Sequence, residues 1–434
     1  MSAFQKQTRR TNLRTLMFGL LLPVMAAPAL KADSYDDTYI ESFYITQCSA
    51  TSANATVKIG SGQAAYGILN DWRIGNGTAD FVQPGEASMG AIGLLYGYNR
   101  LVSAGRSNAN LDGRAKTALS GFFWSWIRNG NNRQGNAFTV NISYDAAGNV
   151  TSKSAGDARV TAELIIAMRK YCQLSPNGDR ANYQSQQYSQ AHAMADYVNV
   201  NINSWTIDRS YAVAAFHSFA NWATAVGDTG TASYYHGRAN DISGQIALAQ
   251  DPGGWHNYYD YLDGNGKGVY NGGINQTGFS PYEFSARPAG ENFAKLLTDW
   301  WEHGTAYNGV ALSQQTNPYA GGVHQWTPAS GTDLKLYPGS ALQLADAEWK
   351  IAKATGNYNN LYGAAWAHYN FAKSGSGCWV NNTSVDGYLG GFIDWVDPVS
   401  NYRPANWQRF VDTSGYFIFA TEELAFSNEV NFSN

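Results

Sequence analysis

A chain of 434 residues with a net charge of −4 and only 14% charged residues lacks the basic surface that nucleic acid or an anionic membrane would require. Its aromatic fraction is also 14%, with 14 Trp and 28 Tyr. Such rings combine an apolar face with a polar tip, which suits a neutral, hydroxyl-rich ligand such as a polysaccharide, although an aromatic-rich helical core has the same composition.

The beginning of the chain indicates export. Lys6, Arg9 and Arg10 precede an apolar run over 16–27, and small residues follow it. This order predicts a signal peptide over 1–32 and a secreted or periplasmic mature protein over 33–434, which we expect to be a single domain and a monomer. No later apolar run is long enough to span a bilayer, so no membrane span is expected in the mature protein.

Helical periodicity dominates the rest of the sequence. Apolar residues recur at three- and four-residue spacing over 86–103, 113–128, 157–172, 186–200, 210–226, 230–249, 289–303, 339–354, 358–373 and 409–427. Residues 141–150 indicate a small strand and turn. Paired helices without an alternating strand pattern predict an all-α fold, an (α/α)6 toroid of helical hairpins.

Long loops are predicted over 250–285, 304–337 and 375–408, and loops of this length in a compact domain are usually functional. We expect them to form a cleft at one end of the toroid. Their aromatic and acidic side chains either line sugar subsites or pack in the core. These side chains are Trp255, Tyr258, Asp260, Asp394 and Trp395.

Polar residues stand at the predicted starts of several helices. In a toroid the starts of alternate helices lie at one end, so Glu86, Asp157, Tyr211 and Glu283 are predicted to converge. Glycoside hydrolysis needs such a set, with one protonated acid and one ionised base. Each residue also has a simpler explanation as a helix cap or a packing residue. A helix start favours the carboxylate form of Glu86, whereas an acid must be protonated; a nearby Asp157 would outweigh the helix dipole.

Four segments, in this order, resemble glycoside hydrolase family 8, whose members cut β-1,4-glucan, chitosan or xylan with inversion. The segments are Gly85-Glu86-Ala87-Ser88-Met89-Gly90, Asp157-Ala158-Arg159-Val160-Thr161, Ser210-Tyr211 with the following residues to Asp228, and Tyr282-Glu283-Phe284-Ser285-Ala286-Arg287-Pro288. The resemblance covers about half of the chain, and it implies an endo-β-1,4-glucanase-like activity.

The resemblance also implies roles for individual residues. Glu86 would be the general acid, Asp157 the residue that binds and bends the sugar, and Tyr211 a partner for the water or ring. Glu283 would be the base, oriented by Arg287, with Tyr282 in the sugar-binding set. The chain departs from the family pattern at Arg159 and Thr161, which replace aspartates. It departs again at the fourth segment, where the base is Glu rather than Asp and one residue is inserted before the arginine. Asp260, Asp263 and Asp394 are alternative bases.

Two other functions fit the same residues. A polysaccharide lyase would use Tyr258, Tyr282 or His256 as base and Arg287 to neutralise a uronate. A catalytically inactive carbohydrate-binding scaffold would keep the fold without turnover. Three widely spaced cysteines and seven histidines predict no metal site, so no cofactor or catalytic metal is expected. Any disulfide would join two of Cys48, Cys172 and Cys378.

Overall fold

In this computed structural model the described residues are 62–69, 81–106, 108–251, 258–269, 275–284, 286, 321–323, 335–356, 358–373, 378–379, 391–397 and 411–434. The helices are α2 (Pro84–Ser103), α3 (Ala109–Ser120), α4 (Ala158–Leu174), α5 (Arg180–Asn201), α6 (Thr206–Ala225), α7 (Thr229–Leu248), α8 (Asn275–Glu283), α10 (Pro338–Thr355), α11 (Tyr358–Lys373) and α12 (Val411–Phe426). The strands are β1 (Phe81–Val82), β2 (Arg133–Gln134), β3 (Ala137–Phe138), β4 (Ile142–Tyr144), β5 (Val150–Lys153), β6 (Tyr261–Leu262) and β7 (Gly268–Val269). The predicted signal peptide and the helix predicted over 289–303 lie outside these residues.

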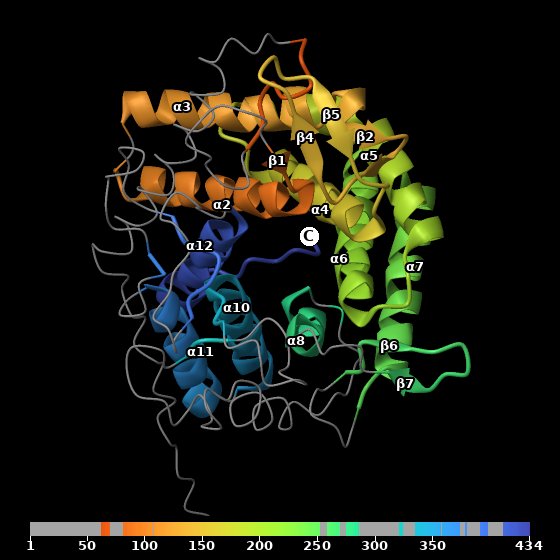
Figure 1. Cartoon of the computed structure of the whole chain (residues 1–434), viewed down its shortest axis with the longest axis vertical. Coiled ribbons are helices and arrows are strands. Elements are labelled where there is room, and N and C mark those ends of the chain that lie inside the picture. The colour runs from red at the N-terminus through yellow and green to blue at the C-terminus, as the bar shows by residue number, and fades with distance from the viewer. Residues whose placement is uncertain are drawn as a thin grey trace, which may run out of the picture.

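Six of the described helices form a closed inner ring (Figure 1). In ring order they are α2, α4, α6, α8, α10 and α12, and α12 packs back against α2. The helices α3, α5, α7 and α11 each pack against the inner helix that precedes them in the chain. Apolar faces at helical spacing make this arrangement possible, since each inner helix buries its side chains against neighbours on several sides. The predicted all-α toroid of helical hairpins is confirmed.

The inner helices α2, α4, α6, α10 and α12 begin at the same end of the ring. Gly85 in the first turn of α2 lies against Glu163 in the second turn of α4, and Gly339 in the first turn of α10 lies against Thr413 in the first turn of α12. The first turns of α4 and α6 meet through one ion pair, described below. We call this the helix-start end. The sequence-based expectation that helix starts converge is therefore confirmed for α2, α4 and α6.

Short strands hold the starts of α2 and α4 together. β4 pairs antiparallel with β1 on one side and with β5 on the other. Because β1 leads directly into α2 and β5 into α4, this sheet places the two helix starts side by side. β4 and β5 also confirm the strand and turn predicted over 141–150.

Residues 275–283 form a helix where the sequence predicts a loop over 250–285. Gly278 and Pro281 suggest turns there, and Pro281 inside α8 cannot donate a backbone hydrogen bond. α8 forms nonetheless because Phe279 and Tyr282 are buried, between α6 and α10; tertiary packing outweighs local propensity. Glu283 was expected just before the start of a helix. It is instead the last residue of α8.

The last residues, 427–434, run back into the ring, and we call them the tail. In Figure 1 this end of the chain lies near the centre of the ring, between α6 and α12. Val430 is 0% exposed and Phe432 is 1% exposed. The tail bonds to the later halves of the inner helices: Ser218 Oγ donates to Phe432 O (2.7 Å), Asn221 Nδ2 to Ser433 O (3.1 Å), Lys170 Nζ to Asn434 O (3.1 Å), and Val430 N to Glu423 Oε1 (2.9 Å).

Two further observations concern membrane spans and disulfides. No helix in the described part of the chain is both long enough and apolar enough to cross a bilayer. Cys172 and Cys378 are both buried and do not form a disulfide with each other.

We predict that Phe432→Ala destabilises the protein by about 3–5 kcal/mol, because the substitution leaves a cavity in the centre of the ring. The ring of Phe432 lies 5.1 Å from that of Phe284 and 5.3 Å from that of Phe419. Denaturant unfolding measures the change. Leu248→Ala, at a side chain that is 72% exposed, is the control and should change stability by no more than about 0.5 kcal/mol. A loss below about 1 kcal/mol for Phe432→Ala would show that the tail does not support the ring.

Candidate functional site

The starts of α2 and α4 carry the two carboxylates that the sequence places there. Glu86 is half-buried in the first turn of α2. Asp157 is the N-cap of α4, and its Oδ1 accepts a hydrogen bond of 2.9 Å from Val160 N. The capping interpretation of Asp157 is confirmed. The cap also fixes the side chain at the helix-start end.

Arg159 links the starts of α4 and α6. Its Nε lies 3.6 Å from Glu163 Oε1 and 3.9 Å from Asp208 Oδ1. Its guanidinium also lies 5.9 Å from the centre of the Tyr211 ring. The Arg159 side chain is 36% exposed, whereas those of its two acidic partners are 7% and 15% exposed. The arginine is thus more exposed than the two carboxyl groups that it contacts.

Glu163 is the most deeply placed of these carboxyl groups. Burial raises its pKa to about 8; Arg159 opposes this, while Asp157, Asp208 and Asp412 raise it further. Because the pKa lies above 7, Glu163 holds a proton at neutral pH. This is the protonation state that a general acid needs.

The absence of a side chain at Gly85 makes room for Glu163. A Cβ built at Gly85 would lie 1.8 Å from Glu163 Oε2, far inside contact distance. The carboxyl group of α4 therefore rests directly on the backbone of α2. Glu86 directly follows Gly85. Glu86 and Glu163 therefore lie at the same corner of the ring, where the starts of α2 and α4 meet.

Tyr211 lies at the helix-start end of α6, where it contacts two other inner helices. Its hydroxyl is 3.5 Å from that of Tyr416 in α12, and its ring centre is 4.0 Å from that of Phe284, which follows α8. Tyr211 is 5% exposed. Burial raises the pKa of Tyr211, and Glu163 and Glu283 raise it further, so the tyrosine lies near both carboxyl groups.

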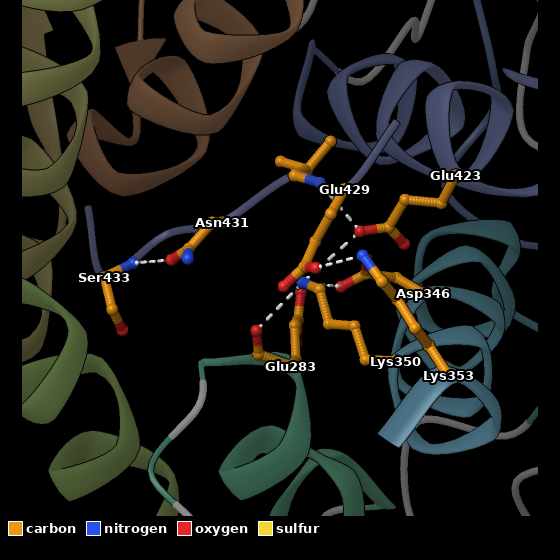
Figure 2. Close-up of polar contacts among 9 residues, drawn as sticks. Glu283, Asp346, Lys350, Lys353, Glu423, Glu429, Asn431 and Ser433 are labelled. Carbon is orange, nitrogen blue, oxygen red and sulfur yellow. Dashed lines mark hydrogen bonds and ion pairs between the residues drawn. The ribbon is translucent and has the colours of Figure 1, made fainter. Parts of the chain in front are cut away.

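Glu283 lies in that interior, 1% exposed, beside a buried lysine. Figure 2 shows Lys350 pointing at its partners: its Nζ donates to Asp346 Oδ2 (2.8 Å) and to the backbone oxygen of Glu283 (3.0 Å), and lies 3.7 Å from Glu423 Oε1. Burial alone would lower the pKa of Lys350, but Asp346 and Glu423 outweigh burial and raise it. Burial, followed by Asp346, raises the pKa of Glu283 well above its usual range.

Three other predicted site residues lie in the core. Tyr258 and Tyr282 are 0% and 2% exposed, and their ring centres are 6.1 Å apart. Asp260 is 0% exposed, and its backbone oxygen accepts a hydrogen bond of 2.8 Å from Thr206 N at the start of α6. These residues support the inner ring in this structure.

The remaining predicted residues are near the surface or outside the described part. Asp394 and Trp395 are half-buried, and Lys335 Nζ lies 4.3 Å from the centre of the Trp395 ring. Trp255 and Arg287 lie outside the described residues, so the orientation of Glu283 by Arg287 stays a prediction.

Sequence reasoning missed three acidic residues of this end: Glu163, Asp208 and Asp412. A signal existed for Glu163, because it is a single carboxylate beside an apolar helical run, and such a group is buried at a cost unless it has a partner. Arg159, four residues earlier, is that partner. Asp208 had the same appearance as an ordinary helix cap, and only the fold brings it to Arg159.

The fold of this chain matches solved structures of carbohydrate-active enzymes. A sugar epimerase from a ruminal bacterium has a TM-score of 0.57 at 10% identity, covering 91% of this chain and 100% of its own. A glucoamylase from Saccharomycopsis fibuligera has a TM-score of 0.53 at 11% identity, covering 93% and 99%. An endoglucanase from the termite Nasutitermes takasagoensis has a TM-score of 0.51 at 12% identity, covering 91% and 100%. At these identities the likeness shows the fold.

No protein-family model matches the chain, and no curated protein matches it significantly. The comparisons thus confirm the toroid fold that the resemblance to family 8 implies. Membership of family 8 itself stays a hypothesis.

We predict that Gly85→Ala destabilises the protein by about 1–3 kcal/mol, because the new methyl group overlaps the Glu163 carboxyl. In a Glu163→Ala background the same change should cost much less, since the methyl group then has space. Thermal or denaturant unfolding of the four proteins measures this coupling. Gly113→Ala is the control: a Cβ there meets nothing within 4 Å, and the change should stabilise α3 by about 0.4–1 kcal/mol. Additive effects at Gly85 and Glu163 would contradict the contact.

Proposed function

We propose that this chain is a glycoside hydrolase that cleaves a β-linked polysaccharide with inversion, of the endo-β-1,4-glucanase type. The observation that carries the proposal is the group of carboxyls at the helix-start end, in a fold shared with carbohydrate-active enzymes. Arg159 Nε lies 3.6 Å from Glu163 and 3.9 Å from Asp208, and Glu86 follows Gly85, against which Glu163 rests. An inverting hydrolase needs one protonated and one ionised carboxyl, and we propose that this group supplies both.

The resemblance to family 8 gives Glu86 the acid role, Glu283 the base role and Asp157 the central sugar contact, with Tyr211 beside it. The surroundings of Glu283 do not suit the role of a base. A base must be ionised, whereas burial and Asp346 keep the pKa of Glu283 well above its usual range. We therefore propose that the base is one of the carboxyls at the helix-start end.

The charges of the described residues at this end favour a neutral or basic sugar polymer. Asp157, Asp208 and Asp412 all raise the pKa of the buried Glu163, and Arg159 is the cation that opposes them. A second cation, Arg209, lies in the first turn of α6, so carboxyls outnumber cations at this end. Such a surface repels an acidic polymer, so it supports a hydrolase of the β-1,4-glucan, chitosan or xylan class over a uronate lyase. We propose that Asp394 and Trp395 add sugar contacts, and that the signal peptide directs the enzyme out of the cell.

Reducing-end release from carboxymethyl-cellulose, lichenan, xylan and chitosan tests the proposal. The protein without residues 1–32 should cut at least one of these polymers. Glu86→Gln should lower kcat/KM by about 10²–10⁴-fold, because a general acid or base contributes that much, while the melting temperature stays close to that of the parent.

The control is Glu429→Gln. This substitution removes a carboxylate of the tail, which pairs with Lys353 (2.6 Å) and is not part of the helix-start end. It should keep the parent activity. Absence of cleavage of every polymer by the parent protein would overturn the hydrolase proposal. An altered sugar in short oligosaccharides without new reducing ends would favour an epimerase, and products absorbing in the ultraviolet would favour a lyase.

A further inference from the structure

Glu86 and Glu163 lie at the same corner in different surroundings. Glu86 is half-buried in the first turn of α2, where the positive end of the helix dipole favours an ionised carboxylate. Glu163 is one turn into α4, is 5% exposed and rests on the backbone of Gly85. The two carboxyls thus differ in burial and in their place on a helix, and a difference in surroundings is the pattern of an acid and base pair.

We propose that Glu163 is the general acid of the hydrolysis and that Glu86 is the base, the reverse of what the family resemblance implies for Glu86. The inference rests on the proposed hydrolase function and deepens it. It also removes a conflict, because an acid at the start of a helix would have to stay protonated against the helix dipole.

Glu163 is surrounded by charged or titratable groups from the helices packed around it. These are Asp157 and Arg159 on α4, Asp208 and Tyr211 on α6, Asp412 on α12 and Glu283 on α8, with Glu86 beside its contact with α2. Arg159 is the cation among them, and it contacts Glu163 from one side (3.6 Å). Burial, together with the excess of carboxyls, raises the pKa of Glu163 to about 8.

The proposed step balances without any further reactant. Glu163 gives its proton to the glycosidic oxygen as the bond from that oxygen to the anomeric carbon breaks. Glu86 takes a proton from a water molecule, whose oxygen forms the new bond to the same carbon from the opposite face. The products are two sugar ends, and proton exchange with solvent restores both glutamates.

Leaving-group dependence separates the two assignments. Glu163→Gln should lower kcat/KM on the polymer by about 10²–10⁴-fold, because protonation of the leaving oxygen is lost. It should retain most of the parent activity on 2,4-dinitrophenyl β-cellobioside, or on the xylobioside where xylan is the polymer, since dinitrophenolate leaves without a proton. Glu86→Gln should lose activity on both substrates.

The pH profile of kcat/KM provides a second readout that a structural role would not move. Its alkaline limb reports the acid of the free enzyme, so the parent limb should lie near pH 8. Asp208→Asn removes a charge that raises the pKa of Glu163, so the limb should move to lower pH. Arg159→Gln removes the charge that lowers this pKa, so the limb should move to higher pH.

The inference is overturned if Glu86→Gln, and not Glu163→Gln, keeps activity on the dinitrophenyl substrate, while the hydrolase proposal stands. It is also overturned if a folded Glu163→Gln variant loses both activities or keeps both. If Glu163→Gln fails to fold, the pH profiles of Asp208→Asn and Arg159→Gln test the assignment. Alkaline limbs that do not move in these two variants contradict it. A parent protein that cuts no polymer rejects the hydrolase proposal itself.

Discussion

The meeting of α8, α10 and α12 in the interior of this protein depends on the buried ammonium group of Lys350. Lys350 is 8% exposed, and taking such a charge out of water costs several kcal/mol unless partners replace the solvent. Asp346, Glu423 and the backbone oxygen of Glu283 replace it, so α8, α10 and α12 must meet at this point. The same Glu423 accepts a hydrogen bond from Val430, which draws the tail into the ring. The short, proline-containing α8 is thereby fixed in the ring by contacts that its own sequence does not provide.

The two ends of the inner helices therefore have different surroundings. The later halves pack around the tail and hold the lysine centre, where Glu283 is neutralised by burial and by its neighbours. The helix starts hold Glu163 against Gly85, with Arg159 reaching from α4 to Asp208 on α6. The half-buried Glu86 and Asp157 lie at the helix starts, where we propose that the acid and base chemistry takes place. Tyr211 packs against Phe284 and Tyr416 and lies near both Glu163 and Glu283.

The sequence predicts the parts of this structure that depend on local pattern. Apolar periodicity is sufficient for α4 and α6, and the residue type at Asp157 is sufficient for its cap. The pattern fails at α8, because Gly278 and Pro281 resemble a turn and only packing between neighbours makes them helical. It also fails at Glu163, whose importance depends on a glycine in a different helix, more than seventy residues away. Glu283 was assigned by motif alone, and a motif carries no information about the lysine that buries it.

We propose that the chemistry of this protein takes place at the helix-start end. A crystal structure of the Glu86→Gln variant with an oligosaccharide of the polymer that the parent cuts tests this. We expect a sugar bound between the starts of α2, α4 and α6, with Asp157 and Glu163 at hydrogen-bond distance from it. A sugar bound elsewhere on the chain, with those two side chains unchanged and untouched, would contradict it.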